Sequence, residues 1–210
     1  MISHRRTGRR VVLLGVPSLY ILLGLVHPMA NPELGDETDL FIWLHIAQLF
    51  LIMGLGYVLW LLVEGVTNRA ATLARALIVP FLVAYTALDA ILGIAWGIAA
   101  EKANDLPTAD HEGAGLLIDE LISGDPDPRG LILYWGAGLL WLAVALAVVA
   151  ALRDTAPLGA LVSMALGAAI FTVGHAPPMG PVGMGLFLFG IAWSEFRPRS
   201  AETLIPAAGA

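Results

Sequence analysis

The sequence predicts an all-α fold, a polytopic integral membrane bundle of about six transmembrane helices with both termini in the cytoplasm. Hydrophobic residues make up 58% of the 210 residues and charged residues 13%, whereas soluble domains carry roughly 25% charged residues. Six long apolar stretches lie between Val11 and Trp193, more than a water-soluble core of this size can bury. The distribution of basic residues gives the orientation.

The apolar stretches are expected to form a single domain and to cross the membrane in turn, at 11–27, 40–63, 76–99, 131–152, 158–174 and 182–196. The first ends where Pro28 stops the helix. The second, third and fourth have 22 or more residues each, enough to cross roughly 30 Å of hydrocarbon. An uncleaved first helix is expected, although its arginine-rich start also suits a signal sequence, because cleavage would leave an odd number of spans.

The last two spans are short, and a segment rich in proline and glycine, 176–181, separates them. Proline and glycine together are strong helix breakers. Two short crossings joined by a tight outer turn are expected here. A re-entrant hairpin that does not fully cross is the alternative, because short interrupted segments are typical of one.

Basic residues are concentrated in alternate gaps between the apolar stretches. With an even number of crossings, these gaps and both termini lie on the same side of the membrane. Nine basic residues lie in the N-terminus, residues 64–75, 153–157 and the C-terminus, against two in the long gaps between. Because cytoplasmic loops are enriched in Lys and Arg, both termini are predicted to be cytoplasmic. The outer loop at 100–130 contains the amphipathic segment 116–122, which predicts a short helix at the outer face.

A small set of ionisable side chains is predicted to meet in the outer leaflet. His27 and His175 come at the outer ends of the first and fifth spans. His45 is expected about 7 Å below that surface, and Asp89 roughly 10–15 Å below it. Helical spacing places Tyr20 and Gly24 on the face of His27, Gln48 on that of His45, and Tyr85, Gly93 and Trp96 on that of Asp89. Such faces suit a bundle interior better than lipid.

These residue types indicate two kinds of cofactor. Because imidazole suits Cu, Zn and Fe, the group His27, His45, Asp89 and His175 is a candidate ligand set for a transition metal. Two histidines among His27, His45 and His175 would instead ligate a b-type haem from opposite faces. The structural alternative is that a neutral Asp89 and the histidines only tie helices together. The motif Asp110-His111-Glu112 is expected to be a solvated turn.

Several classes of function are excluded or left open. The chain has no cysteine, which excludes disulfides, thiolate metal sites and c-type haem attachment, and it has none of the common catalytic signatures. We expect a multi-pass protein of the cell membrane, with the lipid bilayer as its partner and no nucleic acid. Three hypotheses remain: a metal- or haem-binding redox protein, a small proton- or cation-coupled transporter, and an accessory subunit without chemistry of its own. A homo-oligomer and a larger membrane complex both stay open, and no reaction or substrate is indicated.

Overall fold

A computed structural model describes residues 2–28, 37–123 and 129–197, and these residues form helices without any strand. The elements, in order, are α1 (Ile2–Leu25), α2 (Thr38–Leu62), α3 (Arg69–Leu88), the π-helix η2 (Asp89–Ala95), α4 (Trp96–Asn104), the short 3₁₀ helix η3 (Thr108–Asp110), α5 (His111–Ser123), α6 (Arg129–Ala151), α7 (Leu158–Val173) and α8 (Met179–Phe196). The predicted all-α class is confirmed.

Five of these helical segments are long and apolar enough to cross a membrane: Arg6–Leu25, Thr38–Leu62, Arg69–Asn104, Ile132–Ala151 and Met179–Phe196. The apolar helix α7 is shorter, with 16 residues. Large apolar side chains remain exposed along the bundle, including Phe50 at 76%, Leu158 at 75% and Val83 at 66%. An apolar surface of this extent needs a nonpolar solvent, so the chain is a multi-pass membrane protein.

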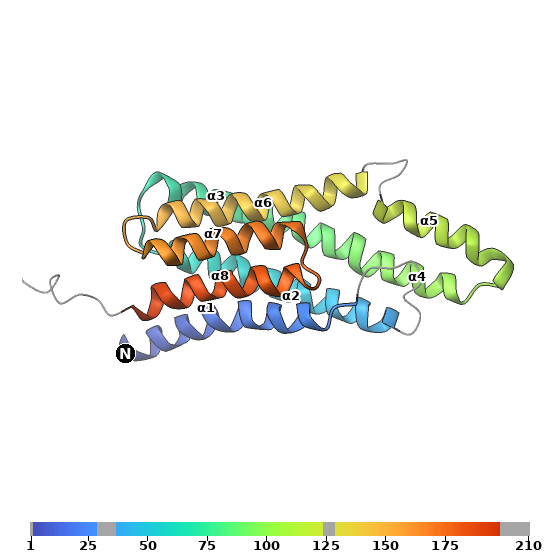
Figure 1. The fold of residues 1–210 in the computed structure, drawn as a ribbon, viewed down its shortest axis with the longest axis horizontal. Helices are drawn as coiled ribbons and strands as arrows, with labels where there is room; N and C mark the ends of the chain where they lie inside the picture. The colour runs from blue at the N-terminus through green and yellow to red at the C-terminus, as the bar shows by residue number, and fades with distance from the viewer. Residues whose placement is uncertain (1, 29–36, 124–128, 198–210) are drawn as a thin grey trace, which may run out of the picture.

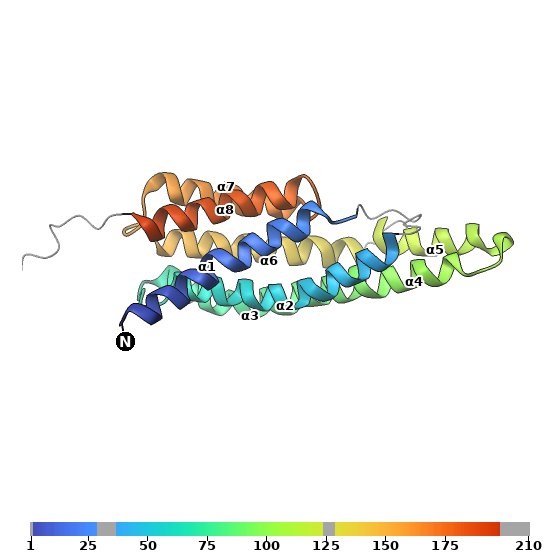
Figure 2. The same ribbon diagram turned by 90° about the horizontal axis from the view of Figure 1, so that it is seen from below.

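The main helices run side by side, and a hairpin of α4 and α5 projects from one end of the bundle (Figure 1). The view from below separates α7 and α8 on one side from α2 and α3 on the other, with α1 and α6 between them (Figure 2). The centre of the bundle holds fully buried aromatic side chains, among them Phe81, Trp141 and Phe187. The Trp141 indole donates a hydrogen bond to the Ala168 carbonyl, at 3.1 Å.

Polar contacts tie the helix ends together at the end where α1 begins and α8 finishes (Figure 1). The Arg9 guanidinium donates to the Leu61 carbonyl at 2.7 Å and pairs with Glu195 at 3.6 Å. The Asn68 amide donates to the Ala151 carbonyl at 2.8 Å. This end carries the basic residues that predict the cytoplasmic side, and we refer to it as the basic end.

The third helix is longer than the expected segment 76–99, because α3, η2 and α4 run without interruption from Arg69 to Asn104. Within it, η2 has the wider π turn, which accommodates an extra residue and is frequent at functional sites. Asp89 begins this segment and Gly93 lies inside it, both buried.

The outer loop at 100–130 contains the expected amphipathic helix, α5, which folds back along α4 (Figure 1). Ile118 of α5 packs in a small apolar cluster with Phe41, Trp96 and Ala100. The Trp96 indole donates to the Ile118 carbonyl at 3.3 Å. Trp96 therefore secures this hairpin to the bundle.

Candidate metal centre

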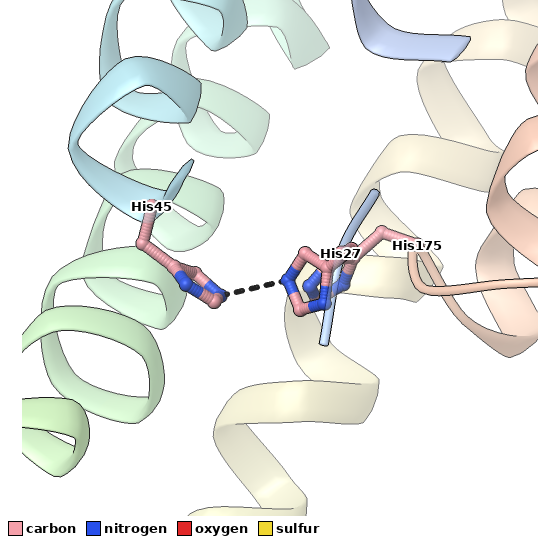
Figure 3. A group of neighbouring side chains, drawn as sticks. All are labelled: His27, His45 and His175. Carbon is pink, nitrogen blue, oxygen red and sulfur yellow. Dashed lines mark hydrogen bonds between the residues drawn. The ribbon is translucent and has the colours of Figure 1, made fainter. Parts of the chain in front are cut away.

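Three histidines from three parts of the chain meet at the end of the bundle opposite the basic end. His27 follows α1, His45 lies in the second turn of α2, and His175 lies in the turn between α7 and α8. One ring nitrogen from each lies within 4.8 Å of those of the other two. Figure 3 shows the three rings turned toward one another from separate segments. We call this group the histidine cluster.

Backbone carbonyls fix the tautomers of two of these rings. The Nδ1 atom of His27 lies 2.6 Å from the Pro28 carbonyl oxygen, and Nδ1 of His45 lies 2.8 Å from that of Phe41. A carbonyl oxygen only accepts, so each Nδ1 carries a hydrogen and donates it. In the neutral rings, each Nε2 therefore holds an unprotonated lone pair. Metal-binding histidines are typically oriented in this way, by a carbonyl on the other ring nitrogen.

The two Nε2 atoms face each other across the centre of the cluster. They lie 3.4 Å apart (Figure 3). Two nitrogens bound to one tetrahedral Zn²⁺, each about 2.0–2.1 Å from the ion, lie roughly 3.3–3.4 Å apart. The spacing between His27 and His45 therefore matches a shared tetrahedral ion.

The third ring, which is partly exposed, completes the group. The His175 ring centroid lies 5.2 Å from that of His27 and 5.9 Å from that of His45, with the rings nearly perpendicular. A side chain at Gly180 would overlap the His175 carbonyl, so this turn requires glycine at that position. Burial lowers the pKa of His175 to about 3, with smaller effects from the neighbouring His27 and His45. At neutral pH the ring is uncharged, which is the form that binds metals.

Gly93 of η2 makes room for the His45 ring. A Cβ atom added at Gly93 would overlap the Cδ2 and Cγ atoms of His45. The His45 side chain is 3% exposed and the His27 side chain 6%, so neither ring has free space into which to move. The π-helix thus determines where His45 lies.

A cavity adjoins the cluster on the side of His175. It is partly open to solvent and encloses about 200 Å³ with the open space counted, and Tyr85, Tyr134, Phe171, Thr172 and His175 are among its lining residues. The cavity offers room for a small ligand such as water, and too little for a porphyrin.

Asp89 lies outside the histidine cluster, as it is not part of the group whose ligand atoms fall within 4.8 Å of one another. It is 1% exposed, and neither carboxyl oxygen has a hydrogen-bond partner. Its carboxylate is close enough to interact electrostatically with the phenol groups of Tyr20 and Tyr85. Of the four residues predicted as a metal-binding set, the structure therefore brings three together and places Asp89 in a separate polar group.

Sequence reasoning misses the residues that orient the cluster. Pro28 and Phe41 act through their backbone carbonyls, which no side-chain pattern reveals. Gly93 shares a helix face with Asp89, yet spacing alone does not place it against His45. The remaining outer-loop histidine, His111, is exposed and hydrogen-bonds the Leu106 carbonyl at 2.7 Å. Comparison of the chain with protein-family models, curated proteins and solved structures found no match.

Proposed function

We propose that the protein binds one transition-metal ion in the cell membrane, with His27, His45 and His175 as ligands. The observation that carries this proposal is the 3.4 Å approach of two Nε2 atoms whose Nδ1 atoms are both occupied by carbonyls. In neutral rings oriented in this way, neither Nε2 donates a hydrogen bond to the other. A cation between them converts a lone-pair repulsion into two coordinate bonds.

Zn²⁺ fits the donor set best. Three imidazoles and one open position are the ligand set of catalytic zinc sites such as that of carbonic anhydrase. The cavity beside His175 gives a small ligand access to that position. Cu and Fe also bind imidazole, and a redox role follows only for these two metals, because Zn²⁺ does not change oxidation state.

A bis-histidine haem is the less suitable occupant. Axial ligands approach iron from opposite faces of the porphyrin, so the porphyrin would have to lie between Nε2 atoms that are only 3.4 Å apart. The cavity volume of about 200 Å³ is also too small. We therefore assign the cluster to a bare ion.

The test is elemental analysis and a visible spectrum of protein purified in detergent without added chelator. We expect about one Zn, Cu or Fe per chain, and Co²⁺ exchanged into the site should give the visible bands of a tetrahedral complex. Single variants His27→Ala, His45→Ala and His175→Ala should each lose most of the metal.

The matched control is His111→Ala, which removes an exposed histidine outside the cluster and should keep full occupancy. A folded, colourless protein that takes up none of the three metals would contradict the proposal. The histidines would then serve to link helices, as expected of an accessory subunit.

A further inference from the structure

A second group of buried polar atoms, separate from the histidine cluster, lies deeper in the bundle. Four oxygen atoms in it lack any hydrogen-bond partner: the Tyr20 hydroxyl, Gln48 Oε1 and both carboxyl oxygens of Asp89. These side chains are 3%, 1% and 1% exposed, respectively. Most buried polar atoms are hydrogen-bonded, and a cluster of exceptions calls for a bound water or ion. We call these three residues the buried polar layer.

The pairing of α2 with the third helix brings Gln48 opposite Asp89. These helices are antiparallel neighbours, and close contacts join Gly56 to Leu82 and Gly93 to His45. Moving along α2 from His45 toward Gly56 therefore corresponds to moving back along the third helix from Gly93 toward Leu82.

Gln48 comes three residues after His45, and Asp89 comes four residues before Gly93. Both are thus about one helical turn from the contact between His45 and Gly93, on the side of the basic end. The two side chains occupy one level of the bundle, a turn deeper than His45.

Tyr20 of α1 lies near the same level of the bundle. Its ring packs edge-on against Phe171 of α7 at 5.9 Å, and the Tyr85 ring stacks on the same Phe171 at 6.3 Å. Asp89 interacts electrostatically with the phenol groups of both tyrosines. Buried oxygen atoms from α1, α2 and η2 without hydrogen-bond partners therefore lie in the same region of the bundle.

No basic side chain neutralises Asp89 in the part of the chain that the structure describes, because none of the ion pairs formed there includes it. Arg9 and Arg75 are occupied at the basic end. An isolated carboxylate in a nonpolar environment costs too much free energy to remain uncompensated. Its counter-charge is either a bound proton or a bound cation.

The lack of a hydrogen-bond partner for either oxygen of Asp89 favours a cation. A protonated Asp89 would donate a hydrogen bond to a neighbouring oxygen within about 2.5–3.0 Å, and neither of its oxygens has such a partner. Oxygens that share a cation of the size of Ca²⁺, at about 2.3–2.6 Å from it, lie roughly 3.3 Å or more apart. A single negative charge balances a monovalent ion, and carboxylate, amide and phenol oxygens are hard ligands that do not favour a soft metal.

We propose that the buried polar layer binds one Na⁺ ion, with Asp89 as the charged ligand and Gln48 and Tyr20 as neutral oxygen ligands. This site is distinct from the metal proposed at the histidine cluster and does not depend on it. Occupancy would join α1, α2 and the third helix through one ion, and bound Na⁺ would stabilise the folded bundle by an amount that grows with the logarithm of its concentration above Kd.

The test is thermal unfolding of the full chain in detergent, with zinc present, in NaCl or in choline chloride of equal concentration. We expect Tm to be higher in NaCl and to rise with Na⁺ concentration as a single-site titration. The Asp89→Asn variant should lose this dependence while binding zinc as the wild type does. His45→Ala should lose zinc and keep the Na⁺ dependence, so the two sites are read separately.

An unchanged wild-type Tm between the two salts would overturn the proposal, and so would a Na⁺ dependence that persists in Asp89→Asn. If Asp89→Asn does not fold, Tyr20→Phe takes its place. This variant removes one neutral ligand and should raise the Na⁺ concentration at which Tm begins to increase by about three- to tenfold. An onset concentration equal to that of the wild type would exclude Tyr20 and overturn the site as drawn.

Discussion

The Nε2 atoms of His27 and His45 lie 3.4 Å apart, and the hydrogen on each ring is used by a backbone carbonyl on the opposite side. Two neutral rings held in this way present lone pairs to each other. A metal ion or a proton between them would turn this lone-pair repulsion into attraction, as proposed above. The backbone carbonyls of Pro28 and Phe41 thus determine that Nε2 is the nitrogen available for binding in these two rings.

Gly93 should be required for metal affinity. The Gly93→Ala substitution places a methyl group where the His45 ring lies, so the ring can no longer hold its present position beside His27. Displacing a group that orients a ligand typically costs about 10–100-fold in metal affinity, and we expect at least a tenfold weaker affinity in competition with a chelating dye. The control is Gly136→Ala on α6, which meets nothing within 4 Å. Equal metal affinities in the two variants would show that Gly93 of η2 does not position His45 for metal binding.

The orientation in the membrane can be read with single cysteines, because the chain has none of its own. Asp110 lies at the tip of the α4–α5 hairpin, and Asp154 lies between α6 and α7, at the basic end. We consider the single variants Asp110→Cys and Asp154→Cys. Both positions are exposed. A membrane-impermeant maleimide should label Asp110→Cys in intact cells and label Asp154→Cys only after permeabilisation. Labelling of Asp154→Cys in intact cells would contradict the predicted cytoplasmic location of the basic end.

Arg75 should contribute to stability through the end of α2. Its guanidinium donates to the carbonyls of Val63 and Val66, at 2.5 and 2.7 Å, and these two bonds hold the turn that follows α2 against α3. Arg75→Ala should lower the free energy of unfolding by about 1–3 kcal/mol, measured by denaturation in detergent. The exposed Arg69 provides the control, since Arg69→Ala should stay within about 0.5 kcal/mol. Equal effects of the two substitutions would argue against this role.

The close packing of α7 on α8 should depend on Gly167. A Cβ atom there would lie 2.5 Å from both the Gly183 carbonyl oxygen and the Phe187 nitrogen, and backbone atoms cannot rotate away. Gly167→Ala should therefore cost about 1–3 kcal/mol, as overpacking does, and lower Tm. In Gly185→Ala, which meets nothing within 4 Å, Tm should be unchanged or higher. A stable Gly167→Ala would show that these helices separate readily.

The fold class follows from the sequence because lipid imposes strong constraints. Backbone groups in hydrocarbon must bond within their own segment, so long apolar runs become helices. The three histidines are predictable for a related reason. Helices that end shortly before Pro28 and Pro177 place His27 and His175 at one level, and His45 is a turn or two from the start of α2. Counting residues from the ends of the spans was sufficient to bring them together.

Asp89 shows where such counting stops. Periodicity places a residue on a helix face, whereas its level relative to other helices depends on how they slide past one another. The π turn at Asp89–Ala95 adds to this, because a single wide turn leaves no sequence signature. The separation of Asp89 from the histidine cluster, and the contact of Gly93 with His45, therefore emerge only from the packed structure.

The uneven helix lengths bear on which bilayers suit the protein. At about 1.5 Å per residue, the 36 residues from Arg69 to Asn104 extend about 54 Å, well beyond the roughly 30 Å of hydrocarbon in a typical bilayer. By the same measure, the 16 residues of α7 reach only about 24 Å. In a thicker membrane the long helix would still span the hydrocarbon. The shorter α7 would not reach both interfaces, which is a hydrophobic mismatch. Lipids with shorter acyl chains should therefore suit this protein best, and α7 sets that preference.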